Sequence, residues 1–162
     1  MASEPDFLSS RAQVSGFDWV ERSMVRHDQV SAPGEGGEAD QVSVELAYET
    51  SPAGAETRFA WLACKVVADD ETARVVVRVR VRFVFPVEVL DEHVRDPHMV
   101  ARLLADHAVD YVLGFARTGL ADELQRAKRP VLLMPLTVSS EIKSHISADP
   151  AGWLAGALTH RA

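Results

Sequence analysis

The sequence lacks several features that identify common classes of protein. It contains a single cysteine, Cys64, which excludes an internal disulfide and any zinc or iron–sulfur site built from several cysteines. No apolar run approaches the roughly 18 to 20 residues that a membrane-spanning helix requires. The acidic start, from Met1 to Asp6, has neither the basic residues nor the apolar stretch of a secretion signal. We therefore expect a cytoplasmic protein with no membrane partner.

Basic residues are outnumbered by acidic ones. Seventeen Lys and Arg against 24 Asp and Glu give the 162-residue chain a formal net charge of −7. This balance argues against bulk attraction to nucleic acid or to anionic membranes, without excluding a local basic patch. The length and composition suit one folded domain over residues 1–162. Residues 42–136 are its best-supported part, and we expect residues 1–16 and 32–41 to be loops or flexible segments.

Several segments show the two-residue period of β-strands. Residues 42–48 are apolar on one face, residues 57–68 are apolar on both faces, and residues 74–85 alternate apolar side chains with Arg. The turns between these segments are short, which predicts three strands paired as an antiparallel meander. A further strand is predicted around residues 17–30.

The last third of the sequence is predicted to be helical. Asp96 and Pro97 suit the N-cap and first position of a long amphipathic helix that ends near residues 126–129. Gly114 and Gly119 lie inside this helix and indicate a kink or a close approach by another backbone. An extended apolar segment follows, and a second Asp-Pro pair at residue 149 opens a short terminal helix.

Neither metal-binding nor nucleophilic chemistry is supported by the spacing of reactive residues. His93, His98 and His107 are five and nine residues apart, so no two of their rings share a helix face as an i, i+4 pair would. Ser139 and its neighbour Ser140 fall in an expected polar loop without the Gly-x-Ser-x-Gly pattern of a nucleophile elbow. The cysteine lies among apolar strand residues, where a thiol is inert. We expect no enzyme activity and no metal.

A stripe of arginines is the unusual charged feature. Arg78, Arg80 and Arg82 share one strand face and form a ladder roughly 13 Å long, because same-face neighbours are about 6.5 to 7 Å apart. The stripe could track phosphates, but few aromatic residues accompany it for base stacking. It could instead pair with Glu45 and Glu49 on the polar face of another strand, or form a subunit contact.

The amount of apolar surface exceeds the predicted helical cover. The strand at residues 57–68 is apolar on both faces, yet only one long and one short helix are predicted. A helix is about 10 Å wide, whereas a four-stranded sheet is nearly 20 Å across. One face or groove must therefore be covered by a partner subunit or a bound ligand.

Four stretches, taken with the order of the elements, carry a family resemblance. They are a strand ending in an acid and Thr at residues 44–50, an Asp-Glu-Thr-Ala turn at 70–73, the helical segment at 112–117, and the helix end and proline-bracketed segment at 124–135. Over about residues 42–136 the chain resembles the SecB family of cytosolic holdase chaperones.

The resemblance implies an α+β fold: a four-stranded antiparallel sheet with one long kinked helix and a short C-terminal helix packed on one side. It also implies dimers that pair into tetramers, and ATP-independent binding of unfolded or aggregation-prone polypeptides in apolar grooves, with no cofactor. The groove candidates, each equally compatible with the core, are Trp61, Phe83, Phe85, Tyr111, Phe115, Leu132 and Met134.

The sequence departs from the family at two places that bear on protein export. Val77 occupies the family's acidic position that docks the secretion motor, and the alternation of Val and Arg at residues 79–82 replaces a Gln-Gln-Gly-Gly stretch. We therefore do not expect motor docking, and a dedicated client such as an antitoxin fits better than general export. The alternatives are a partner-binding or scaffolding protein of the same fold without holdase activity, and nucleic-acid binding through the arginine stripe.

Overall fold

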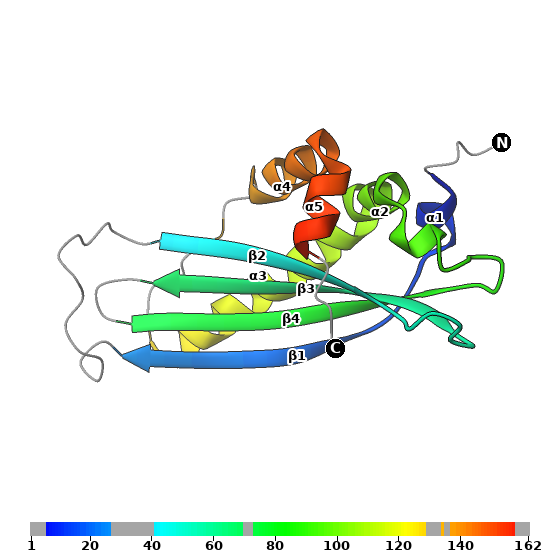
Figure 1. Ribbon diagram of the computed structural model, residues 1–162. Helices are drawn as coiled ribbons and strands as arrows, with labels where there is room; N and C mark the ends of the chain where they lie inside the picture. The colour runs from blue at the N-terminus through cyan, green and yellow to red at the C-terminus, as the bar shows by residue number, and fades with distance from the viewer. Residues whose placement is uncertain (1–5, 27–40, 70–72, 129–133, 135–136, 158–162) are drawn as a thin grey trace.

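The structure, a computed structural model, describes residues 6–26, 41–69, 73–128, 134 and 137–157. These residues form two layers, with the sheet in front and the helices behind and above it in Figure 1. The chain therefore has the α+β architecture that the sequence predicts.

Four antiparallel strands make up the sheet. They are β1 (Gln13–Arg26), β2 (Gln41–Thr50), β3 (Arg58–Asp69) and β4 (Ala73–Phe85). Their order is β1-β4-β3-β2, so the predicted meander of β2, β3 and β4 is confirmed, and β1 extends it by pairing with β4. The strand predicted around residues 17–30 begins four residues earlier, and residues 27–30 lie outside the described residues.

The helices pack on one face of the sheet. The long helix is interrupted by a π-helical turn, η3 (Leu104–Ala108), which separates its first part from its main part. A short 3-10 helix, η2 (His93–Arg95), precedes it. The remaining elements, in chain order, are α1 (Asp6–Arg11), α2 (Pro97–Leu103), η3 (Leu104–Ala108), α3 (Val109–Arg126), α4 (Thr137–Ala148) and α5 (Pro150–Ala157).

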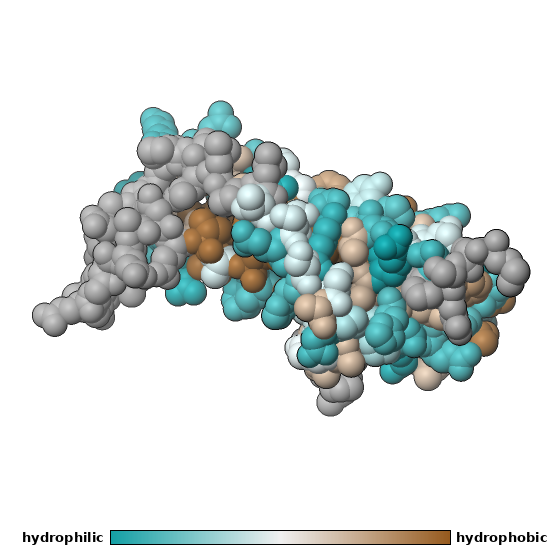
Figure 2. Space-filling view, turned by 90° about the horizontal axis from the view of Figure 1, so that it is seen from above, coloured by the Kyte–Doolittle hydropathy of each residue, from teal (hydrophilic) through white to brown (hydrophobic). Residues whose placement is uncertain are grey.

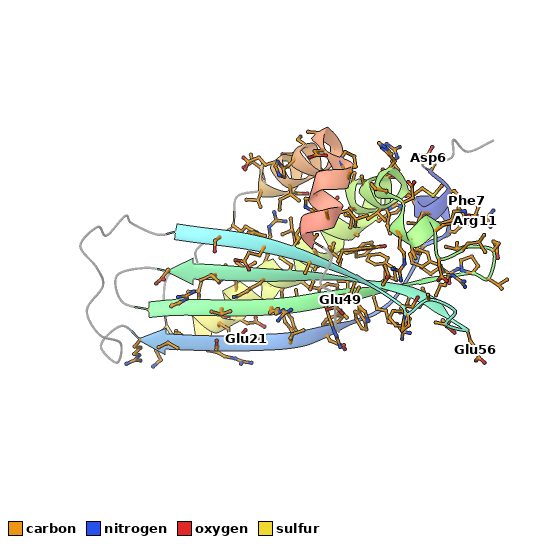
Figure 3. All side chains as sticks on the ribbon, viewed as in Figure 1. Asp6, Phe7, Arg11, Glu21, Glu49 and Glu56 are labelled. Atoms are coloured by element: carbon orange, nitrogen blue, oxygen red, sulfur yellow. The ribbon has the colours of Figure 1, made fainter. Side chains whose placement is uncertain are left out.

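Two helices lie where the sequence predicts loops. Residues 1–16 were expected to be loop or flexible, but α1 and the start of β1 fall there. Leu8 of α1 is fully buried, and Arg102 Nε lies 2.9 Å from Asp6 Oδ1, which ties α1 to α2. Figure 3 shows Asp6, Phe7 and Arg11 gathered at this end of the molecule. Most of the predicted 32–41 loop lies outside the described residues.

The second missed helix is α4, where Ser139 and Ser140 belong to a helical turn and not to a polar loop. Val138, Ile142 and Ile146 recur every four residues there, and Ile146 is fully buried. This spacing is typical of a helix with one apolar face. The expected N-caps are confirmed, since Met99 N donates to Asp96 Oδ1 at 2.9 Å and Gly152 N donates to Asp149 Oδ1 at 3.0 Å.

The irregularity of the long helix lies at η3, about two to three turns before Gly114, the glycine at which a kink was expected. Gly114 is exposed, and a Cβ placed on it would meet no atom within 4 Å. Gly119 is a site of close approach, but by a side chain and not by a backbone. A Cβ built on it would lie 2.5 Å from Trp19 Cζ3 and 2.9 Å from Val77 Cγ1.

The core lies between the sheet and the helices. It contains the side chains of β3 and β4 that point toward α3, including Leu62, Val79 and Phe83, each at most 2% exposed. The hydroxyl of Tyr48 donates to the carbonyl oxygen of Val94 at 3.0 Å, which satisfies a polar group in this apolar region. Burial raises the pKa of Tyr48 because the charged form loses hydration.

Two glycine substitutions on the same helix test this packing. We expect Gly119→Ala to lower the free energy of unfolding by about 1 to 3 kcal/mol, because the added methyl group displaces Trp19 or the helix. Gly114→Ala, the matched control, should raise it by up to about 1 kcal/mol, since Ala is a better helix former and the site is open. Urea unfolding of both variants measures the difference, and equal effects would contradict the close contact with Trp19.

Candidate functional site

Most of the exposed apolar surface lies on β1. Val14, Phe17, Trp19, Val20 and Val25 are 36% to 47% exposed, and they are five of the eight large hydrophobic side chains exposed among the described residues. We call these five the β1 surface. Among the described residues, β4 is the only strand that pairs with β1, so no described strand lies along the outer backbone edge of β1. An apolar edge strand of this length has the properties of a surface that can pair with another chain.

Side-chain contacts hold the edge strand against α3. The ring of Phe17 stacks on that of Phe115, with centroids 4.1 Å apart and planes inclined by 18°. Arg22 donates from Nε to Glu123 Oε1 at 2.9 Å and from Nη2 to Asp122 Oδ2 at 3.3 Å. The β1 surface is therefore presented in a fixed position.

A small hollow lies beside the interruption of the long helix. It has a volume of about 220 Å³ and is lined by Ala12, Val14, Phe83, His107 and Tyr111. Tyr111 is 49% exposed, whereas Phe83 forms the floor at 2%. Two of the predicted groove residues, Phe83 and Tyr111, therefore line the same hollow.

A larger groove lies at the opposite edge of the sheet, between β2 and the helical pair α4 and α5. Its volume is about 300 Å³, at the lower end of the range for ligand pockets. In Figure 2, which looks down on this side, hydrophobic atoms are exposed beside the polar surface. We call it the β2 groove, and it is lined by Val44, Leu46, Glu141, Ile142, His145 and Trp153.

Helix α4, which lines one side of the β2 groove, is held against α3 by the carboxylate of Asp110. Asp110 accepts a hydrogen bond from Lys143 Nζ at 2.6 Å and another from Ser139 Oγ at 2.5 Å, both from α4. The hydrogen bonds from Lys143 and Ser139 hold the pKa of Asp110 below its ordinary value.

The predicted groove residues do not form one site. Phe83, Phe85 and Met134 are core residues at 2% to 5% exposed. Tyr111 and Phe115 lie at the β1 side of α3, and Leu132 is outside the described residues. Trp61 lies on the opposite face of the sheet, because its register partner on β4 is Arg82.

Residues that sequence reasoning missed, all of them apolar, are Val14, Phe17, Trp19, Val44, Leu46, Ile142 and Trp153.

The arginine stripe lies on the face of the sheet away from the helices. Arg80 donates from Nη2 and Nε to Asp18 Oδ2 on β1, at 3.0 and 3.1 Å, and its guanidinium lies 4.2 Å from the centre of the Trp61 ring. The sequence did not predict Asp18 as the partner of an arginine in this stripe. Glu45 and Glu49 share the face, but they are on β2, and β3 separates them from the stripe.

The described residues offer few reactive groups. Burial raises the pKa of the Cys64 thiol to about 12, because the thiolate would lose its hydration. Among the residues with described positions, no three His, Cys, Asp or Glu side chains are placed to hold a metal ion. No described helix has the length and apolarity needed to cross a bilayer. The expectations of no metal, no cofactor and no catalysis stay expectations.

The fold is SecB-like. The chain is similar to a solved structure of Rv1957, a SecB-like chaperone of Mycobacterium tuberculosis in complex with a ChAD peptide from the antitoxin HigA1. The match has a TM-score of 0.58 and 14% sequence identity, and it covers 84% of this chain and 99% of that chain. The predicted resemblance is therefore confirmed for the fold, at an identity that shows the fold alone.

The other comparisons add little. A protein of unknown function from Streptococcus agalactiae matches with a TM-score of 0.47 and 8% identity, over 77% of this chain and 97% of that chain. A TM-score this low supports no further conclusion. No protein-family model matches the chain, and neither does any curated protein.

The stability that Asp110 contributes by holding α4 against α3 should depend on pH. Because the pKa of Asp110 is lowered in the folded protein, its ionised form stabilises the fold above its ordinary pKa, and this contribution is lost as the pH falls through the lowered value. The side chain of Asp110 is 56% exposed, so we expect less than about 1 kcal/mol. Asp110→Asn should lower the free energy of unfolding at pH 7, and this effect should shrink as the pH falls below the ordinary pKa of an aspartate.

The control for this measurement is Glu141→Gln, which removes one carboxylate from α4, the helix that Asp110 contacts. Its effect on the free energy of unfolding should be smaller at pH 7. A difference between wild type and Asp110→Asn that persists unchanged at low pH would contradict the role given to the ionised carboxylate.

Proposed function

We propose that this protein is a cytoplasmic chaperone that binds non-native polypeptides in the β2 groove without using ATP. The observation that carries the proposal is the groove itself, an open apolar hollow of about 300 Å³ at a sheet edge. Its lining supplies Val44, Leu46, Ile142 and Trp153 and only two polar side chains, Glu141 and His145. Such a surface binds apolar side chains of many sequences, because little in it demands a specific hydrogen-bonding partner.

The energy of this interaction suits a holding role. Burying one Leu- or Phe-sized client side chain contributes about 1.5 to 3 kcal/mol. A few such contacts hold an extended chain against aggregation and still allow its release. No bond is made or broken, so the proposed activity needs no catalytic group and no cofactor.

The SecB-like fold supports the same proposal. Rv1957, the structural neighbour, is a SecB-like chaperone bound to an antitoxin peptide. A dedicated, aggregation-prone client of that kind is the class that we propose for this chain. Protein export through the secretion motor is not part of the proposal, since Val77 is buried in the core and stands where the family has its docking acid.

We also propose that the chain associates with itself through β1. The β1 surface combines apolar side chains with a backbone edge that no described strand pairs with, and a second copy of the chain would cover both. Antiparallel pairing of two β1 strands around a two-fold axis would continue the sheet from one protomer into the next. Pairing of this type closes at a dimer, and a tetramer would need a second contact surface.

Substitution in the β2 groove tests the client-binding proposal. We expect Leu46→Ser to weaken the suppression of aggregation of a chemically unfolded model protein by about tenfold, measured by light scattering without ATP. Leu90→Ser is the matched control, because Leu90 is 47% exposed and lies outside the groove. If the wild type at stoichiometric excess suppresses no aggregation, the protein is instead a partner-binding protein of this fold.

A pair of matched Val→Lys variants tests self-association. Multi-angle light scattering should give the wild type a mass that is a multiple of the chain mass. Val20→Lys places like charges at the proposed contact and should shift the mass toward the monomer. Val87→Lys should leave it unchanged, because Val87 is 86% exposed in the loop after β4. A wild type that is monomeric at every concentration would remove the proposal.

A further inference from the structure

The helix-free face of the sheet carries a positively charged strip along its middle. By strand register, side chains from the two central strands alone supply it, and Asp69, the register partner of Arg74, is the acid among them. We call this set of cations the cationic strip, and it consists of Lys65, Arg74, Arg78, Arg80 and Arg82. Acids on the two outer strands form its borders. Glu21 of β1 and Glu49 of β2, labelled in Figure 3, lie on opposite sides of it.

Part of this charge forms no ion pair within 4 Å among the described residues. Lys65 and Arg78 are direct register partners on β3 and β4, and like charges directly opposite each other destabilise a sheet. Neither of them has a carboxylate within 4 Å among the described residues, whereas Arg80 has Asp18. Their register partners on the outer strands are acids, Glu45 opposite Lys65 and Glu21 opposite Arg78. Because neither acid forms an ion pair with its partner, an external anion can still bind the two adjacent cations.

Arg82, a third cation of the strip, lies beside two aromatic rings. Its guanidinium lies 4.6 Å from the centre of the Phe59 ring and 5.8 Å from that of Trp61. Its Nε is buried and has no hydrogen-bond partner within the described parts of the chain. The aromatic rings hold the guanidinium group on this face of the sheet.

We propose that the cationic strip binds an extended, acidic segment of a partner polypeptide. Same-face side chains are about 6.5 to 7 Å apart along a strand, so carboxylates at alternate positions of an extended peptide match Arg78, Arg80 and Arg82 in spacing. The strip is two strands wide, about 10 Å, which accommodates one extended chain between its acidic borders.

The acidic residues on both sides of the cationic strip favour a peptide over a nucleic acid as its ligand. Double-stranded DNA carries one negative charge per about 1.7 Å of its axis, and part of that charge would lie over Asp18 and Glu21 on one side or Glu45 and Glu49 on the other. Base stacking is also disfavoured, because guanidinium groups already lie over Phe59 and Trp61. A single peptide with spaced carboxylates avoids both difficulties.

This site is separate from the proposed client groove. The β2 groove faces α4 and α5, whereas the cationic strip lies on the other side of the same sheet. A loss of aggregation suppression therefore leaves the acidic-segment proposal standing, and the reverse also holds.

The test uses fluorescence anisotropy with the full chain and a fluorescein-labelled peptide that carries Glu at alternate positions and spans the length of β4. The matched peptide has Gln at every Glu position. We expect the Glu peptide to bind, the Gln peptide not to bind, and the affinity to fall as salt is raised. The double variant Lys65→Gln/Arg78→Gln should bind the Glu peptide about tenfold more weakly.

The charge-matched control is Arg26→Gln/Arg126→Gln, which removes two exposed cations outside the cationic strip. It should keep wild-type affinity, and circular dichroism should show that both double variants are folded. Equal losses in the two double variants would mean that net charge alone attracts the peptide, and would overturn the proposal. A single-stranded oligonucleotide that binds more tightly than the Glu peptide would overturn the choice of a polypeptide partner.

Discussion

The two-residue alternation of β4 is the constraint on which the rest of the structure depends. Every second side chain from Val75 to Phe85 enters the core beneath α3, and the side chains between them include Arg78, Arg80 and Arg82. A slip of one residue would turn these arginines into the apolar layer, where an unpaired charge is very costly. The register of β4 is therefore strongly determined, and β3 and β1 take their registers from it.

The elements that could be predicted are those whose signals are local. The alternation in β2, β3 and β4 is regular, and Asp96 with Pro97 marks a helix start by capping chemistry alone. β1 was predicted only approximately because its register shifts near Ser15 and Val20, which breaks the alternation that a sequence pattern relies on. The helix α4 was missed because its serines suggested a loop, although its apolar residues recur every four positions.

The candidate site was harder to predict than the fold, because exposure is decided by distant parts of the chain. Trp61 and Phe83 are both aromatic strand residues, yet one lies beneath arginines on the helix-free face and the other is sealed in the core. The β2 groove joins Leu46 to Ile142 and Trp153, which are about a hundred residues away in sequence. Apolar character alone could not separate these roles.

The same period of two explains how one thin sheet offers chemically different surfaces. Along β2, Val44 and Leu46 line an apolar groove, while Glu45 between them borders a charged face. Neighbours in sequence therefore belong to opposite sides of the molecule, and a ligand on one side cannot touch the other. Because the backbone of β2 and β3 is shared but the side chains are not, the groove and the charged face can be occupied together without competing for any residue.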